Sequence, residues 1–412
     1  MLNSCRVLDL TNERGQLCSQ ILGDLAADVI QVEPPGGSPV RKLGPFFEDQ
    51  PTPDRSIYWW AYNRNKRGIT LNLETSEGRD LLLRLGDSAD FMIESENPGA
   101  MAAMGLGYRD FAVRNPKLIY VSITPFGQDG PKAHYADTDL IVMAAAGPLI
   151  LYGDEDRPPI RMSVPQAYLH ASTDAAGAAL IAYYERIRSG EGQAIDVSAV
   201  QSLGLAMQSI MLAAPIGATD TKRMAGGAKM GPIRVPLVWK AKDGQISFVF
   251  LFGSALGVFT RHFMDYLYEI GGCDKPTHDK DWIAYGDMLL SGKEPMEEYE
   301  RIKRLLADFI ATKTKAEIFE LARARNFLMA PVATVADVLE NPQFHDRGYW
   351  QKLEHPELGR SFPYPGPFAR FSRTPIGYSR RPPLIGEHNA EVYGELGLNA
   401  NQIADYSRRG II

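Results

Sequence analysis

Cysteine, long apolar runs and targeting signals are scarce in this sequence. The 412 residues include only 3 cysteines, at positions 5, 18 and 273, and no C-x-x-C pair, which argues against a disulfide framework and a zinc site. The longest apolar run, residues 140–152, spans about 13 residues and contains Pro148, so it is too short to cross a bilayer. The chain opens without a basic segment followed by an apolar stretch, and we expect a cytoplasmic protein.

An excess of positive charge is also missing. Lys and Arg number 44 against 50 Asp and Glu, which gives a formal net charge of −6 and disfavours nucleic acid and anionic membranes as partners. The sequence contains no G-x-S-x-G, H-E-x-x-H, G-x-G-x-x-G or G-x-x-x-x-G-K motif, so several large enzyme classes lack their usual support. With 45% hydrophobic and 23% charged residues, the composition is that of a globular chain.

Short apolar strands alternate with helical segments in the first third of the chain. This alternation predicts a mostly parallel sheet with helices on both faces. In such sheets ligands bind beyond the carboxyl ends of the strands, so we expect the site in the loops after Leu10, Val32, Ile93 and Ile123. The strands are predicted at residues 7–10, 28–32, 68–73, 90–93 and 118–123.

The pattern changes near residue 219. Before it, we predict a helix over residues 168–184, a strand over 194–197 and an apolar helix over 203–214. Residues 219–236 are rich in Gly, Lys and Arg and are typical of a linker or a mobile loop. The chain is therefore divided into the N-terminal part of a large domain at residues 1–218, a small domain with linkers at 219–325, and the C-terminal part of the large domain at 326–412.

Two local patterns allow more than one interpretation. The glycine-rich residues 226–231 could cradle a ligand carbonyl or phosphate with backbone N–H groups, or form a flexible turn between domains. His170 and Asp174 lie four residues apart on a predicted helix. They could act together as a general base or form half a metal site, or they could simply be a polar stripe along the helix.

Five segments resemble one protein family in the same order and together span almost the whole chain. The segments are VLDLTNERGQLCSQILGDLAADVIQVEPPGGSPVR, NRNKRGITLNLETSEGRDLL, SITPFGQDGP, RIRSGEGQAIDVS and LIGEHNAEVYGELGL. On these segments the chain is identified as a member of the family III CoA-transferases. The resemblance implies an α/β fold with a Rossmann-like large domain built from both chain ends, a smaller α+β domain between them, and two chains interlocked as a dimer.

The resemblance also places the aspartate that serves the family as nucleophile. Counting back from Gly190, the first glycine of the family's R-T-G-R-G-Q-like turn, that position holds Tyr168. Related racemases have a histidine where this chain has Thr138. A carboxyl carbon carries CoA as a thioester during transfer, and a phenol has no such carbonyl. No catalytic residue is therefore expected at Tyr168, and an insertion or deletion would leave Asp174 as the nucleophile.

Binding positions of the family are partly kept. The resemblance assigns CoA binding to Arg41, Asn65, Lys66, Ser95, Met104 and Lys132, and lining of the acyl site to Glu13, Arg14 and Tyr168. Glu96 and Ala103 depart from the family pattern, and Glu96 would repel CoA phosphates. The family uses CoA thioesters as substrates, so neither a covalently bound cofactor nor a metal is expected.

Three hypotheses follow from the missing aspartate. In the first, a paralogous family III chain supplies the nucleophile, and the complex moves CoA between succinyl-CoA and a carboxylic acid such as benzylsuccinate. The segment PQAYLHAS resembles the non-nucleophilic chain of such enzymes. In the second, a homodimer works alone as a transferase through Asp174, or as a lyase or isomerase with His170 as base. In the third, the protein binds CoA esters without turnover.

Overall fold

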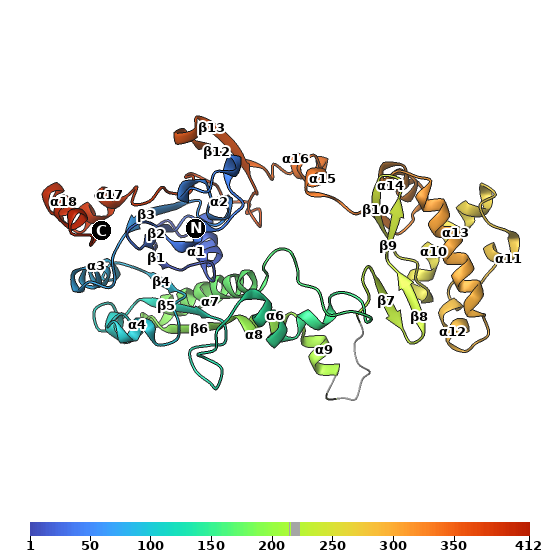
Figure 1. Ribbon diagram of the computed structural model, residues 1–412, viewed down its shortest axis with the longest axis horizontal. Coiled ribbons are helices and arrows are strands. Elements are labelled where there is room, and N and C mark those ends of the chain that lie inside the picture. Colours follow the sequence, from blue (N-terminus) through green and yellow to red (C-terminus); the bar gives the residue numbers. More distant parts are fainter. Residues whose placement is uncertain (214, 216–222) are drawn as a thin grey trace. The chain divides into compact units, whose positions relative to one another are not determined.

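The chain folds into two compact units (Figure 1). The computed structural model describes residues 1–213, 215 and 223–412, so residues 219–222 of the expected linker lie outside the described part. The first unit comprises Met1–Leu149, Arg161–Ile216 and Gln343–Ile412, and the second comprises Ile150–Ile160 and Gly217–Pro342. The first unit is thus built from both ends of the chain.

A six-stranded sheet forms the centre of the first unit. All its neighbouring strands are parallel, and their order is β3-β2-β1-β4-β5-β6. This order confirms the expected Rossmann-like α/β fold, and its direction of winding reverses between β1 and β4. The strands are β1 (Arg6–Leu10), β2 (Asp28–Glu33), β3 (Lys66–Thr70), β4 (Phe91–Glu94), β5 (Ile119–Thr124) and β6 (Ala194–Ser198).

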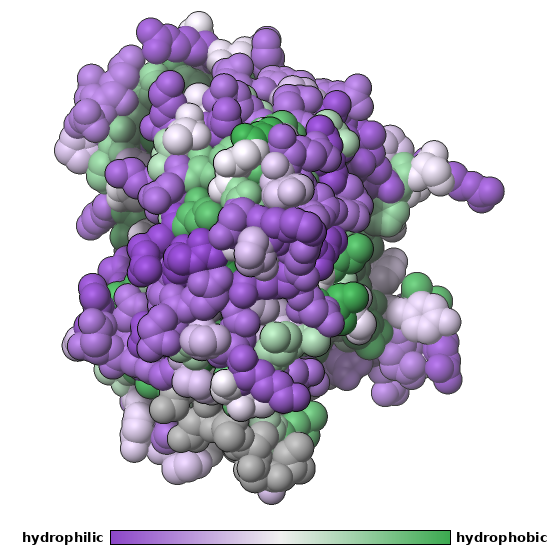
Figure 2. All heavy atoms as spheres, turned by 90° about the vertical axis from the view of Figure 1, so that its right-hand side faces the viewer, coloured by the Kyte–Doolittle hydropathy of each residue, from purple (hydrophilic) through white to green (hydrophobic). Residues whose placement is uncertain are grey.

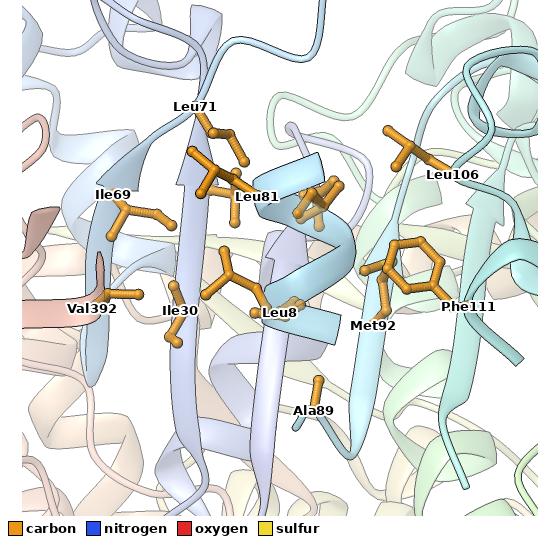
Figure 3. Close-up of a cluster of buried hydrophobic side chains, with 14 of the residues drawn as sticks. Leu8, Ile30, Ile69, Leu71, Leu81, Ala89, Met92, Leu106, Phe111 and Val392 are labelled. Carbon is orange, nitrogen blue, oxygen red and sulfur yellow. The ribbon is translucent and has the colours of Figure 1, made fainter. Parts of the chain in front are cut away.

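Helices cover both faces of this sheet. Neighbouring residues of a strand point to opposite faces, and Met92 packs in the cluster that includes Leu81 of α3 (Ser76–Gly86), whereas Phe91 contacts Tyr183 of α7 (Ala167–Ser189). Figure 3 shows the α3 side, where Val392 of α17 (Asn389–Glu395) joins the same cluster from the far end of the chain. This shared core ties the C-terminal segment to the sheet.

Smaller elements complete the first unit. The apolar helix predicted over residues 203–214 is two helices within its described part. The remaining elements are α1 (Gln16–Asp24), α2 (Ile57–Tyr62), α4 (Ala100–Ala103), α5 (Tyr108–Ala112), α6 (Asp139–Ala146), α8 (Ala199–Leu205), α9 (Gln208–Ala213), α16 (Pro342–Asp346), β12 (Gln351–His355), β13 (Arg360–Tyr364) and α18 (Ala400–Arg408).

The second unit is of α+β type, with an antiparallel sheet of order β11-β10-β9, a hairpin of β7 and β8, and a separate core around Phe248, Phe263 and Trp282. Its elements are β7 (Gly227–Met230), β8 (Ile233–Pro236), β9 (Val238–Ala241), β10 (Gly244–Phe248), α10 (Gly253–Glu269), α11 (Lys275–His278), α12 (Tyr285–Leu290), α13 (Met296–Ala311), α14 (Lys315–Arg325), β11 (Met329–Pro331) and α15 (Val335–Leu339).

The hairpin of β7 and β8 replaces part of the expected linker. The glycine-rich stretch is neither an open turn nor a loop there, because residues 227–230 pair with 233–236. A Cβ atom on Gly227 would lie 2.5 Å from the carbonyl oxygen of Val235, so this glycine permits close strand approach.

Hydrophilic residues cover most of the face shown in Figure 2, and hydrophobic residues appear there in small groups. Over the described ranges, no helix is both long enough and apolar enough to cross a membrane.

Candidate active site

A cavity opens where the strand order of the large sheet reverses. The loops that follow β1 and β4 meet there, since Arg14 Nη1 donates to the Ser95 carbonyl oxygen over 3.2 Å. The other walls are formed by the start of α7, the loop before α6, helix α2 and Leu43. The cavity measures about 320 Å³ and is lined by Glu13, Arg14, Leu43, Tyr58, Tyr62, Asp137, Thr138, Asp139, Val164, Pro165, Tyr168 and Leu169.

Arg14, Asp137 and Tyr168 form a connected group in this cavity. Arg14 Nη2 lies 2.6 Å from Asp137 Oδ1, and the Tyr168 hydroxyl donates to Asp137 Oδ2. Burial raises the pKa of Tyr168, and the hydrogen bond to Asp137 and its charge raise the pKa further. Tyr168 is therefore a neutral phenol that donates a hydrogen bond, and both oxygens of Asp137 are occupied.

Asp139 fixes the start of the helix that carries Tyr168. Its Oδ1 accepts hydrogen bonds from the backbone N–H groups of Gln166, at 2.7 Å, and Ala167, at 2.8 Å. A carboxylate suits the N-terminus of a helix, where backbone N–H groups lack partners. Thr138 caps α6 by accepting from Ile141 N–H, so this segment anchors two helices beside the cavity.

Asp137, Tyr58 and Tyr62 are among the cavity residues that were not expected from the sequence. Asp137 follows a run of loop residues and precedes a helix cap, which resembles an ordinary turn. Tyr58 and Tyr62 contact each other with ring centroids 4.9 Å apart on α2. Their spacing of four residues is the one signal that could have placed them on a common helix face.

His170 and Asp174 lie elsewhere on α7. Both side chains are exposed, and neither lines the cavity that contains Tyr168. The buried positions of the helix run through Tyr168, Ser172 and Ala175 instead. The structure therefore separates the two alternative catalytic residues from the expected acyl site.

The two cations expected to bind CoA phosphates have partners within the chain. Arg41 is 1% exposed and binds Glu33 through Nε, at 2.6 Å, and Nη2, at 2.7 Å. Lys66 is 0% exposed, and its Nζ lies 2.8 Å from Asp9 Oδ2. Burial lowers the pKa of Lys66, and the charge of Asp9 opposes this effect. Neither cation is directed at a solvent-filled space.

The other expected CoA-binding residues are dispersed. Asn65 donates to Asp24 over 2.9 Å, Ser95 exchanges hydrogen bonds with Asn12, and Lys132 is exposed. Met104 lines a second cavity of about 500 Å³ beyond the ends of β1 to β3. The residues lining that cavity are Leu10, Val32, Glu33, Pro34, Pro35, Leu71, Asn72, Leu73, Glu74, Glu96, Met101 and Met104, so its charged members are glutamates.

The buried carboxyl of Glu94 lies at the end of β4. Glu94 Oε2 accepts from the Glu96 N–H over 2.7 Å. Burial raises the pKa of Glu94 to about 7, and the charges of Glu96 and Asp196 also raise it. Among the residues that the structure describes, no group of three or more His, Cys, Asp or Glu side chains is placed to hold a metal ion.

The fold is that of an α/β protein with a parallel sheet, and its candidate small-molecule site lies beside the loop that follows β1, one of the two strands between which the strand order reverses. Residues 2–389 match the family model described as CoA-transferase family III. The chain is 33% identical over 414 residues to the succinyl-CoA:(R)-benzylsuccinate CoA-transferase subunit BbsE of Thauera aromatica, a match that covers 99% of this chain and 97% of that protein. The chain belongs to CoA-transferase family III.

Other relatives agree with this assignment. The succinyl-CoA:glutarate CoA-transferase of Mus musculus is 29% identical over 397 residues, which cover 96% of this chain and 86% of that protein. The crystal structure of a CAIB/BAIF family protein from Brucella suis superposes with a TM-score of 0.80 at 28% identity, covering 96% of this chain and 99% of that one. CoA thioesters are the substrates of the family, and both named transferases use succinyl-CoA.

Proposed function

We propose that this chain is the subunit without a nucleophile in a heteromeric CoA-transferase. The complex would move CoA between succinyl-CoA and a carboxylic acid such as benzylsuccinate, and a paralogous chain would supply the aspartate. The observation that carries the proposal is that Tyr168 lies in the cavity as a phenol that donates a hydrogen bond to Asp137. The resemblance to the family gives Tyr168 the position of the nucleophilic aspartate. Similarity to a protein named as a subunit supports the proposal. The interlocked assembly and a cytoplasmic location are part of the same proposal.

The chemistry of transfer explains why Tyr168 is decisive. A carboxylate attacks the donor thioester, forms a mixed anhydride and releases CoA as thiolate; the thiolate then attacks the enzyme's carbonyl and displaces the donor acid. The acceptor carboxylate next attacks this enzyme thioester, which forms a second mixed anhydride and releases CoA as thiolate. The thiolate then attacks the acceptor's carbonyl and displaces the enzyme carboxylate. A phenol has no carbonyl to carry CoA, so this chain needs a carboxylate from another source.

Asp137 supports a second candidate, in which this chain catalyses transfer alone. It places a carboxylate in the cavity, next to Tyr168. The first candidate is better supported, because Arg14 and Tyr168 occupy both oxygens and draw electron density from them. Asp137 would have to leave both partners before it could attack a thioester.

Co-expression with a paralogue that has an aspartate in place of Tyr168 tests the heteromeric proposal. Native mass spectrometry should detect a mixed complex, because an interlocked fold buries enough apolar surface to make each chain depend on its partner. The chain expressed alone should be less soluble or less stable. A clean separation into two homodimers would refute the proposal.

A further inference from the structure

Arg14 is held as a rigid receptor for an anion. Its Nη1 donates to the Ser95 carbonyl oxygen, at 3.2 Å, and to Asn97 Oδ1, at 3.3 Å. The backbone N–H of Arg14 donates to Asn12 Oδ1 over 3.1 Å. These bonds fix the guanidinium with Nη2 directed at the cavity. A fixed guanidinium beside a hydroxyl donor matches the two oxygens of a carboxylate.

Asp137, in the loop before α6, occupies the anion position beside Arg14. One of its oxygens binds Arg14 Nη2 and the other accepts from Tyr168, and its side chain is 9% exposed. Within the described part of the chain, these side-chain contacts are the hydrogen bonds that Asp137 makes. Arg14 and Tyr168 thus hold its carboxylate, while the adjoining Thr138 and Asp139 tie its backbone to the starts of α6 and α7.

We propose that Asp137 is an internal substitute for a substrate carboxylate. It occupies the anion position formed by Arg14 and Tyr168, and thereby closes this chain's acyl cavity to carboxylic acids. When the Asp137 side chain is absent, the same position binds an external carboxylate. All three side chains of this anion position come from this chain.

The cavity wall indicates the chemical class of the external ligand. Tyr58, Tyr62, Val164 and Leu169 offer apolar and aromatic surface next to the anion position, in a space of about 320 Å³. Arg14 is the cationic residue in this lining, which also includes the exposed Glu13. The matching ligand is a small acid with one carboxylate and an apolar body, since the lining also carries the carboxylates of Glu13 and Asp139, which would repel a second one.

Calorimetry on the purified full-length chain tests this site with phenylacetate as the probe. Asp137→Gly should bind phenylacetate at least tenfold more tightly than the wild-type chain does. Phenylacetamide, which has the same shape without the charge, should show no such gain. Adding Arg14→Gln to Asp137→Gly should abolish the gain. Asp87→Gly is the matched control, because it frees Arg114 from a surface ion pair of 2.6 Å and neither residue lines the cavity that contains Tyr168.

Three results would overturn the proposal: no gain for Asp137→Gly, an equal gain for phenylacetamide, or a gain that survives Arg14→Gln. If Asp137→Gly is poorly folded, Asp137→Ser and a thermal-shift comparison replace calorimetry. Phenylacetate should then raise the Tm of either variant more than phenylacetamide does, and an equal or absent shift would count against the site. Turnover by the wild-type chain would contradict the heteromeric function but leave these binding results intact.

Discussion

At the scale of single residues, the large unit stabilises its charges within the chain. Lys66 is surrounded by Asp9, Gln31 and Asn63, whose oxygens lie 2.8, 3.2 and 2.9 Å from Nζ. Such a group stabilises only while it is complete, because removal of one partner leaves a buried charge without compensation. Lys66 is therefore a structural cation of the large unit.

Lys66→Met should lower the free energy of unfolding by about 3–5 kcal/mol, because it leaves Asp9 buried and unpaired. Urea unfolding followed by circular dichroism measures this loss. Lys132→Met is the matched control, since Lys132 is exposed, and should change stability by less than about 0.5 kcal/mol. Equal small effects for the two variants would show that Lys66 is not a structural cation.

Glu94 should make stability depend on pH. The pKa of Glu94 is about 7 in the folded chain, against an ordinary value of 4.5. Between pH 4.5 and pH 7, the folded state therefore binds this proton more strongly than the unfolded state does. Stability then falls as pH rises from about 4.5 to about 7 and loses about 3 kcal/mol in total. Glu94→Gln should remove this fall and be the more stable protein at pH 8.

Unfolding in urea at pH 5 and pH 8 measures the effect. Glu74→Gln, at an exposed glutamate of the second cavity, is the control and should retain the wild-type dependence. A wild-type chain equally stable at both values, with Glu94→Gln unchanged, would contradict the assignment of a buried neutral carboxyl.

At the scale of elements, the start of α7 determines where Tyr168 lies. Asp139→Ala should cost about 1–2 kcal/mol of unfolding free energy, because two N–H groups at the helix N-terminus lose their acceptor. Asp174→Ala, on the exposed face of the same helix, should cost less than about 0.5 kcal/mol. Similar costs for both would contradict the anchoring role of Asp139.

The sheet was predictable because its strands carry a local signal. Residues 28–32 and 118–123 were predicted as strands and form β2 (Asp28–Glu33) and β5 (Ile119–Thr124). Residues 326–342 were expected to belong to the large domain, but they belong to the second unit, where β11 (Met329–Pro331) pairs with β10. Three strand residues carry too little periodicity to indicate which sheet they join.

The candidate site was less predictable, because its contacts join residues far apart in the chain. The resemblance placed Tyr168 and Arg14, but no local pattern could show that Asp137 connects them. Likewise, Arg41 and Lys66 have the charge that suits a phosphate, and only the fold shows that Glu33 and Asp9 already neutralise it. Charge can be predicted from sequence, whereas its partner depends on the tertiary structure.

At the scale of the whole molecule, both chain ends contribute to one core around the large sheet. The second unit, which lies between these ends in the sequence, has a core of its own. The chain belongs to a family of enzymes, yet the cavity proposed as its acyl site holds a phenol and an ion-paired carboxylate. A protein with these features is consistent with division of labour between two related chains. The paralogue would carry CoA, and this chain would complete the assembly.

Adduct mapping after exposure to succinyl-CoA tests the central claim, that this chain does not carry CoA. The full-length chain and the mixed complex are each incubated with succinyl-CoA, and intact-protein and peptide mass spectrometry locate any CoA thioester. The account predicts an adduct on the aspartate of the paralogue and none on this chain in either sample. A CoA thioester on Asp137, Asp174 or any other residue of this chain would contradict it.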